Sequence, residues 1–465
     1  MKVRLIGTNI ELAPVLSALS GETEEPVLLS PEPIAAAYAR ISRSEDSVDA
    51  LRHDARLNVE KARKSNRNIV FDMGHASIAE HAVFNFDIEE VSRLAIEKLE
   101  HTRLASYTER SQRYVLIGED FLVPAELTAT GGQADQFRAA VQALFGQYAR
   151  TYDALLARHL AAEPKPPKRM RRRDLETAAK EDARYLLPLA TTGQLGLTIN
   201  ARSLESTVKR LKGSCFEEIR ELGRRLETAA LEVTPSLIRY TEPTGLEECA
   251  ESEGEEALTS ADAPAPQEVR LAWHTPSGDQ VLSGLMSGRG WQVAGHQDSG
   301  EKIEDYFNRA SPWDRAPRSF EFVDLVFDLT CSASCFAQLK RHRMASFRWG
   351  PYDPALGVVV PPSVSAAGLE IRFKETLAQP MALFDELEPA GNPGRYYLLT
   401  NAHCRRVLMK MNLRELYHFT RLRMDPHAQW EIRGIAGQMC ALAQGAFPEA
   451  AGFLGGKHEF SKLKG

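Results

Sequence analysis

The sequence is poor in cysteine, with six in 465 residues, which excludes a small scaffold held together by disulfides. It also lacks any uninterrupted run of 18 apolar residues, so no membrane-spanning helix is expected. Its net charge of −6 gives no excess of cations for a general nucleic-acid coat or a membrane-surface role. The first residues have two early cations but no long apolar run, which favours a first strand over a signal peptide. We therefore expect a cytoplasmic protein with no membrane association and no nucleic-acid partner.

Apolar residues are plentiful: 43% of the chain is hydrophobic and 26% is charged, as is typical of globular proteins. A length of 465 residues favours two or three domains. Residues 246–267 break the composition, with six glutamates followed by Ala, Pro and Asp, and they predict a solvated linker. An acidic surface helix is the alternative. The expected domains are therefore residues 1–245 and 268–465, joined by this linker.

The two parts of the chain share ordered blocks of sequence. Alternating apolar residues give way to a helical run and then to Arg-x-x-Ser, which ends at Ser106 and again at Ser346, 240 residues later. A second helical block begins at Asn200 and again at Asn412, 212 residues later. The order is kept while the spacing shrinks, as a tandem duplication with loop loss would give. Repeats of this length indicate two homologous domains rather than a solenoid.

The hydrophobic patterns predict an α/β (α+β) fold, with a mixed sheet packed against helices in each half. Strands are expected near Lys2–Ile6, Ala82–Ile88 and Glu321–Leu329. Helices are expected near residues 49–65, 89–103, 134–160, 174–188, 201–211, 214–230, 332–343, 413–422 and 427–445.

The densest cluster of functional residue types is Gln338-Leu-Lys-Arg341-His342-Arg343. Gln338 lies three residues before Arg341, one helical turn earlier. Two guanidinium groups beside an imidazole suit a phosphate group or the edge of a flavin. The alternative is a solvated basic helix end, which the helix dipole favours.

Four polar residues are predicted to share one face of a later helix: Asn412, Arg414, His418 and Arg423. An arginine on a half-buried face is costly to desolvate, so this face should meet an anionic or planar partner. An intramolecular ion pair with Glu431 or Asp425 is the alternative.

The first half contains a polar segment that we predict to be extended. Ser111 and Arg113 lie two residues apart in it and would point to the same side. A hydroxyl group and a guanidinium that point together can clamp a phosphate, although such pairs are also common in loops. Arg184 adds a further cation at the end of an apolar helix.

Taken together, these motifs resemble those of the flavin-dependent thymidylate synthases, in the family's order and over most of the chain outside the linker. In the first half the matching segments are His75–His81, Ser106–Tyr114, Glu181–Pro188 and Asn200–Arg202. In the second half they are Arg341–Ser346, Asn412–Arg414, Leu422–Arg423 and Ala428–Arg433.

Each half departs from the family pattern where the other half keeps it. In the first half, Arg-His-Arg reads His101-Thr102-Arg103, the preceding Gln is Lys98, and the late Arg is Leu211 with Arg210 beside it. In the second half, Asn-Glu-x-Ser-x-Arg-Tyr is replaced by residues 348–354. We interpret this complementarity as specialisation of the two halves on one composite site; decay after loss of function is the alternative. The chain would be a pseudo-dimer, and a homodimer would rebuild the family's tetramer as a pseudo-tetramer.

The resemblance implies the FAD-dependent conversion of dUMP to dTMP, with methylenetetrahydrofolate as one-carbon donor and NADPH as reductant. It implies that Arg423 acts in catalysis, contacting the uracil and favouring ionisation at its N3. The implied substrate-binding residues are Glu109, Ser111, Arg113, Arg184, Gln338 and Arg341. The implied FAD-binding residues are Ser77, Glu109, Arg341, His342, Arg343, Asn412, Arg414 and His418. No metal site is expected.

Two other functions stay open: a related flavoenzyme acting on another pyrimidine nucleotide, and a non-catalytic protein that binds a nucleotide or a flavin. Residues 165–173 form a basic run outside the family pattern. This run is either a solvated loop and helix start or a feature that attracts polyanionic folate or NADPH to the mouth of the site.

Overall fold

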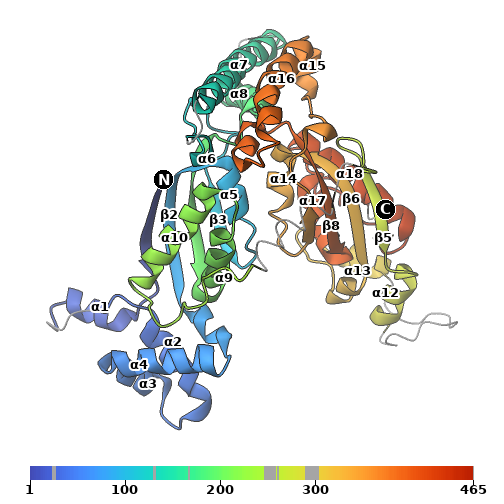
Figure 1. The fold of residues 1–465 in the computed structure, drawn as a ribbon. Helices are drawn as coiled ribbons and strands as arrows, with labels where there is room; N and C mark the ends of the chain where they lie inside the picture. Colours follow the sequence, from blue (N-terminus) through green and yellow to red (C-terminus); the bar gives the residue numbers. More distant parts are fainter. Residues whose placement is uncertain are drawn as a thin grey trace. The chain divides into compact units, whose positions relative to one another are not determined.

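The computed structural model describes residues 1–22, 28–128, 132–165, 168–245, 258, 261–287 and 303–463. These residues form two compact units, which we describe separately (Figure 1). The first unit comprises Met1–Phe145, Pro188–Glu251 and Ala378–Leu398, and the second comprises Gly146–Leu187, Ser252–Leu377 and Leu399–Gly465. Most of the segment predicted to be an acidic linker lies outside the described residues.

The first unit contains an antiparallel sheet in the order β1 (Lys2–Thr8), β2 (Val83–Ser92), β4 (Thr192–Asn200), β3 (Ala105–Glu109). In β2, Phe84, Phe86 and Ile88 are buried while Asn85 and Asp87 are exposed, the alternation of a strand with one covered face. The helices α9 (Ala201–Lys212) and α10 (Glu217–Leu231) lie over the sheet in the view of Figure 1. Among its described residues, the other helices lying wholly within this unit are α1 (Leu12–Leu19), α2 (Glu32–Arg40), α3 (Val48–Leu57), α4 (Val59–Arg67), α5 (Arg93–Leu99) and α6 (Ala125–Thr128).

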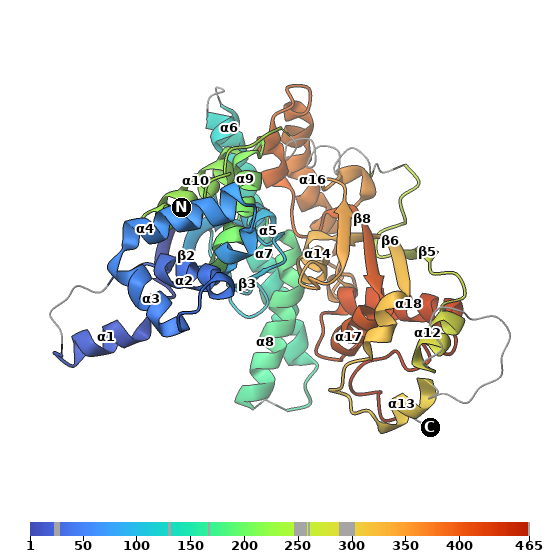
Figure 2. The same ribbon diagram turned by 90° about the horizontal axis from the view of Figure 1, so that it is seen from below.

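Three of these helices, α2, α3 and α4, form a small satellite cluster (Figure 2). Their shared core is built largely from alanine: Ala36, Ala37, Leu51, Ala55 and Ala62 are buried. Small side chains allow the helix backbones to approach closely, because little volume has to be accommodated between them.

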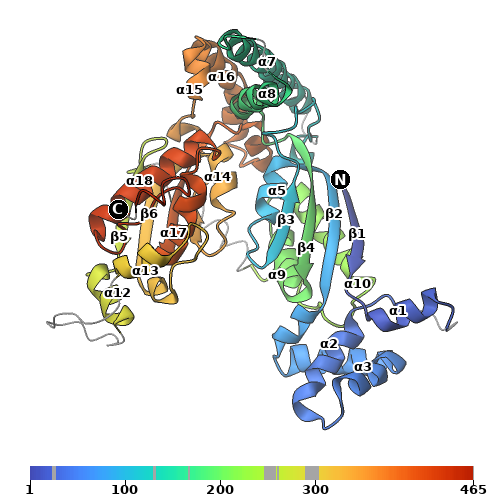
Figure 3. The same ribbon diagram turned by 180° about the vertical axis from the view of Figure 1, so that it is seen from behind.

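The second unit repeats the same topology, with an antiparallel sheet in the order β5 (Val269–His274), β6 (Asp324–Ser332), β8 (Cys404–Asn412), β7 (Ser346–Trp349). The register shifts between Leu5 and Gly7 in the first sheet and between Leu271 and Trp273 in the second, so both first strands carry an irregularity in their pairing. The helices α17 (Leu413–Arg423) and α18 (Trp430–Ala446) lie in front of the second sheet in Figure 3. The other helices that the structure describes wholly within this unit are α8 (Arg169–Ala183), α12 (Gly278–Met286), α13 (Ile303–Arg309), α14 (Ala333–Leu339) and α15 (Pro362–Ala366).

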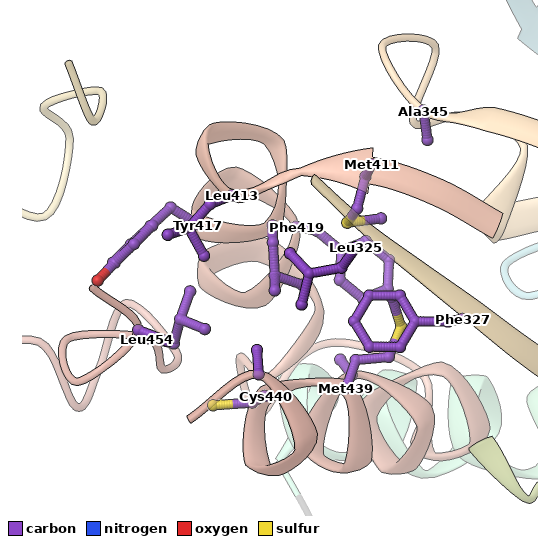
Figure 4. Packing of buried hydrophobic residues seen from close by; sticks show 14 of the residues in the cluster. Leu325, Phe327, Ala345, Met411, Leu413, Tyr417, Phe419, Met439, Cys440 and Leu454 are labelled. Carbon is purple, nitrogen blue, oxygen red and sulfur yellow. The ribbon is translucent and has the colours of Figure 1, made fainter. Parts of the chain in front are cut away.

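The core of the second unit forms between its sheet and these two helices. Phe327 and Met411 come from the strands, Phe419 from α17 and Met439 from α18, and all four are buried (Figure 4). Burying side chains of this size removes a large apolar area from water, at roughly 25 cal/mol per Å². This packing fixes α17 against the sheet and thereby places the polar residues of α17.

The compact units do not coincide with the two sequence halves. Residues 146–187 come from the first half but belong to the second unit, and residues 378–398 come from the second half but belong to the first unit. The chain crosses between units within α7 (Gln133–Ala161) and α16 (Glu370–Leu387). Each half therefore completes the other's unit with a segment of its own.

The α/β class is confirmed, although all named strand pairs are antiparallel where we expected mixed sheets. The helix predicted over 89–103 is wrong at its start, because β2 continues through a bulge near Glu90 to Ser92. The helix predicted over 332–343 ends at Leu339, which leaves Arg341 outside it. Within the described ranges, no helix combines the length and the apolarity needed to cross a bilayer.

Candidate functional site

Tyr185 connects a first-half segment to second-half elements within the second unit. Its Oη donates to Oε2 of Glu431 at 2.5 Å, and Nε2 of Gln429 donates to the same Oη at 2.8 Å. Glu431 also accepts from N and Oγ of Ser332, at 3.0 and 2.5 Å. Ser332 in turn caps α14, accepting from N of Cys335 at 3.1 Å. The network therefore runs from Tyr185 to the start of the helix that carries Gln338.

The first unit contains the reciprocal network. Oη of Tyr397 donates to Oε2 of Glu218 at 2.9 Å, and Glu218 accepts from N and Oγ of Ser92 at 2.7 and 2.6 Å. Ser92 caps α5, accepting from N of Ala95 at 2.9 Å. Each half therefore supplies a tyrosine to the serine–glutamate pair of the other half.

Burial controls the protonation of these groups. It raises the pKa of the Glu431 carboxyl, against the lowering effect of the hydrogen bonds from Ser332 and Tyr185 and of the charge on Arg184. Burial also raises the pKa of the Tyr185 phenol well above its ordinary value, and the charge of Glu431 adds to this rise. The phenol consequently stays protonated and acts as a hydrogen-bond donor.

Arg184 directly precedes Tyr185 and is buried in the second unit, with 7% of its surface exposed. Its Nε donates to the carbonyl oxygen of Glu181 at 3.2 Å, and its own carbonyl oxygen accepts from Nδ2 of Asn401 at 2.9 Å. Because Tyr185 is fixed to Glu431, the backbone that carries Arg184 is held on both sides. The same unit contains the substrate and catalytic residues predicted in the second half, Gln338, Arg341 and Arg423.

Arg423 lies at the end of α17, against the turn that follows α14. Its Nε donates to Nε2 of His342 at 2.9 Å, and its Nη2 donates to the carbonyl oxygen of Gln338 at 3.2 Å. Nδ1 of His342 lies 3.2 Å from Oε1 of Glu415. His342 is buried, with 4% exposed, and burial lowers its pKa. The structure therefore brings Arg423, His342 and Gln338 together.

Three of the predicted cofactor residues are exposed in this unit: Arg341, Arg343 and His418. The two arginines flank His342 in the turn after α14, and the ring of His418 lies 6.0 Å from the ring of His342. The exposed side chains thus offer guanidinium and imidazole donors beside the half-buried Arg423 and the buried His342.

Asn412 and Arg414, also predicted to hold the cofactor, have structural contacts. Asn412 caps α17, with Oδ1 accepting from N of Glu415 at 2.9 Å. Arg414 donates from Nε to the carbonyl oxygen of Ala316 and from Nη1 to Oε1 of Glu321, both at 2.7 Å. An ion pair, the alternative considered for this face, thus exists between Arg414 and Glu321.

Apart from Arg184, the predicted site residues of the first half lie in the first unit. Glu109 ends β3, Ser77 is exposed in a short 3-10 helix, and Ser111 and Arg113 follow β3. The extended geometry predicted for the last two is wrong, because Oγ of Ser111 accepts from N of Arg113 at 3.2 Å and residues 112–114 form a turn. Arg113 lies over the ring of Tyr114, 5.6 Å from its centroid.

Arg210 of the first half makes the contacts that correspond to those of Arg423. Its Nη1 donates to the carbonyl oxygen of Lys98 at 2.9 Å, and its Nη2 donates to Oγ1 of Thr102 at 3.4 Å. Lys98 and Thr102 precede Gln338 and His342 by 240 residues. The arginine missing at Leu211 is therefore replaced structurally by its neighbour in sequence.

Sequence reasoning missed the role of Tyr185, and it considered Glu431 as an ion-pair candidate and as part of a family motif but not as the partner of Tyr185. No local signal pairs them, since 246 residues separate the two. The role of Asn412 as a helix cap had a signal, because asparagine before a helical run is a preferred N-cap. Among the residues that the structure describes, no group of three or more His, Cys, Asp or Glu is arranged to hold a metal ion.

Comparison with known proteins gives matches in both halves. The family model described as thymidylate synthase complementing protein matches residues 27–236 and 276–449. A UPF0159 protein of Chlamydia muridarum is 24% identical over 437 residues, covering 86% of this chain and 82% of the relative. A flavin-dependent thymidylate synthase of Geobacter sulfurreducens is 32% identical over 224 residues, covering 46% of this chain and 83% of the relative. Among solved structures, thymidylate synthase X of Helicobacter pylori with FAD and dUMP matches at 20% identity and a TM-score of 0.31, covering 51% of this chain and 100% of that chain.

Proposed function

The chain belongs to the thymidylate synthase complementing protein family, and we propose that it is a flavin-dependent enzyme that methylates dUMP to dTMP. Methylenetetrahydrofolate would give the carbon, NADPH would give the electrons, and FAD would carry the hydride. Two relatives that each match 46% of this chain are flavin-dependent thymidylate synthases. Their similarity supports the reaction class.

One observation carries the proposal furthest: Arg184 of the first half is built into the unit that holds Arg423, Gln338 and Arg341 of the second half. These four side chains supply two functions that are needed to bind a nucleoside monophosphate: contact with its phosphate and contact with its pyrimidine edge. Arg184 and Arg341 are suited to its phosphate, because guanidinium groups bind phosphate oxygens in pairs. Arg423 is suited to the pyrimidine edge, where a positive charge stabilises the anion formed by loss of the N3 proton.

We further propose that Ser111 and Arg113, with Glu109, complete the nucleotide site. They would be supplied by the same chain or by a second copy, and a homodimer would then contain the pseudo-tetramer expected from the sequence. A hydroxyl group and an arginine add phosphate contacts that the second half has lost, since its residues 348–354 read Arg-Trp-Gly-Pro-Tyr-Asp-Pro.

The donor set of the second unit fits FAD. Arg341, Arg343 and His418 are exposed on neighbouring segments, and cationic donors of this kind suit the pyrophosphate of a dinucleotide. Asn412 caps the helix that carries Arg414 and His418, and it would support this helix together with the Glu321 ion pair already described. Ser77 and Glu109 would contribute from the first half, as the family resemblance implies.

The proposal is tested by purifying the full chain, recording its absorbance spectrum and measuring dTMP formation from dUMP with methylenetetrahydrofolate and NADPH. We expect a bound-flavin spectrum and dTMP. Flavin without dTMP would contradict the assigned reaction and favour another pyrimidine nucleotide as substrate. A colourless protein that gains neither colour nor activity with added FAD would contradict the proposal altogether.

A further inference from the structure

The contact between Arg423 and His342 assigns the position of the proton on the imidazole. An arginine Nε can only donate a hydrogen bond, so Nε2 of His342, 2.9 Å away, must accept. The proton of the neutral ring then sits on Nδ1, which faces Oε1 of Glu415 at 3.2 Å. Glu415, His342 and Arg423 therefore form a relay in which each hydrogen bond has one donor and one acceptor.

On balance the surroundings of His342 oppose a second proton: burial and the charge of Arg423 lower its pKa and outweigh Glu415, which raises it. The ring is 4% exposed and packs edge-on against Phe419, with the centroids 4.7 Å apart. The titratable and charged groups that face it are Glu415, Arg423 and His418, all on α17. Protonation of Nε2 would place one N–H donor and one positive charge against another, and Arg423 would lose its acceptor.

The first half provides an internal comparison. Arg210 donates there to Thr102, whose hydroxyl occupies the sequence position of His342 and also bonds Oγ1 of Thr207 at 2.7 Å. A threonine hydroxyl accepts at any ordinary pH. The duplicated arginine site thus exists in two forms. In one the arginine's acceptor, His342, can titrate, and in the other the acceptor, Thr102, does not.

We infer that His342 is a positioning residue for Arg423, which it holds against the carbonyl oxygen of Gln338 only while its ring is neutral. Low pH would release Arg423 and weaken binding of the pyrimidine nucleotide. Arg210, held by Thr102, would stay in place. The inference deepens the proposed function, on which its nucleotide-binding consequence rests.

The first test is the nitrogen NMR spectrum of the full chain with ¹⁵N-labelled histidine. We expect the His342 signals, assigned by their loss in His342→Gln, to show a ring protonated at Nδ1 alone down to a pH below the ordinary histidine pKa of about 6.5. Arg423→Ala should shift the Nε2 signal, because that nitrogen loses its donor. A ring protonated at Nε2, or an Nε2 signal unaffected by Arg423→Ala, would overturn the inference without reference to any ligand.

The second test measures the affinity for dUMP by titration calorimetry from about pH 8 down to a pH below the one at which the NMR spectrum shows His342 taking up its second proton. In the wild type it should fall by up to about tenfold per pH unit once His342 takes up a proton. The phosphate of dUMP also titrates, but His342→Gln shares that effect, so the ratio of the two affinities isolates the histidine. The glutamine of His342→Gln offers an acceptor to Arg423 and a donor to Glu415, and it does not titrate. The ratio of the wild-type affinity to the variant affinity should therefore change with pH. Thr102→Val serves as the matched control and should leave the wild-type pH dependence unchanged.

A ratio that is constant with pH would overturn the inference. Failure of dUMP to bind at any pH would contradict the proposed function instead, and the NMR result would still decide whether His342 positions Arg423.

Discussion

Tyr185, from the first half of the sequence, donates a 2.5 Å hydrogen bond to the buried carboxyl of Glu431, from the second half. Tyr397 and Glu218 form the reciprocal pair in the other unit at 2.9 Å. These two hydrogen bonds mark an exchange of segments between the halves, and the exchange places Arg184 in the same compact unit as Arg423. They also make the exchange testable by single substitutions.

Removing the hydroxyl of Tyr185 should destabilise the protein. Tyr185→Phe leaves the Oε2 atom of Glu431 and the Nε2 atom of Gln429 each without one buried partner, at an expected cost of about 2 to 4 kcal/mol. Tyr397→Phe loses a single bond and should cost about 1 to 3 kcal/mol. Urea unfolding measures both, with Tyr240→Phe, whose residue is 54% exposed, as the neutral control. Equal stability of all three variants would contradict the role assigned to the networks.

The exchange predicts that the two halves stay together after the chain is cut. A specific protease site inserted in the acidic segment 246–256 would give two fragments after cleavage. They should elute as one species in gel filtration, because residues 146–187 remain in the second unit and residues 378–398 in the first. The uncut variant is the control for elution volume. Fragments that separate without denaturant would show that the exchanged segments do not hold the units together.

Stability should fall as the pH is lowered, because of His403. Its buried Nδ1 accepts from N of Thr400 at 2.9 Å, and burial lowers the pKa of His403 to about 4. The unfolded chain binds this proton below about pH 6.5 while the folded chain does not. The free energy of unfolding should therefore decline between about pH 6.5 and pH 4, by up to about 3 kcal/mol.

His403→Asn isolates this effect, because its amide oxygen can accept from Thr400 but does not titrate. Urea unfolding at several pH values should show a shallower decline for the variant than for the wild type. Identical slopes would mean that His403 does not contribute.

Arg423 and Arg210 offer a matched pair for the catalytic assignment. Both donate to a backbone carbonyl oxygen at corresponding positions, Gln338 and Lys98. Arg423→Ala should lower the rate of dTMP formation by about 100-fold or more, the usual cost of a preorganised charged donor. Arg210→Ala should change it little, since the first half has lost the neighbouring Arg-His-Arg. A comparable loss in Arg210→Ala would show that both arginine sites serve catalysis.

Much of the fold follows from local sequence patterns. The alternation of Phe84, Phe86 and Ile88 predicts β2, and the apolar periodicity of α17 and α18 predicts both helices to within a few residues. The strands β4 and β8 were not predicted. In β8, Arg405 and Arg406 interrupt the apolar pattern, and the structure shows why they are tolerated: Arg405 stacks on Tyr352, 4.0 Å from the ring centroid, and Arg406 pairs with Asp328.

The candidate site was less accessible to sequence reasoning, because its contacts are long-range. The motifs identified Arg184, Gln338 and Arg423, but not that Tyr185 anchors the first of them through Glu431. His342 was expected to hold the cofactor, and only the structure shows its ring buried between Glu415 and Arg423. Arg210 was visible beside Leu211, yet its contacts with Lys98 and Thr102 required the fold.

The central claim, that one active site needs both sequence halves, is tested most directly by dTMP formation in Arg113→Ala, Arg423→Ala and the double variant. Arg110→Ala, an exposed neighbour that bonds Gln194, is the control. We predict that each single variant loses about 100-fold or more, that the double variant loses little further, and that the control stays near wild type. Recovery of activity on mixing the two single variants would place the shared site between two copies of the chain. Near-normal turnover in either single variant would contradict a site built from both halves.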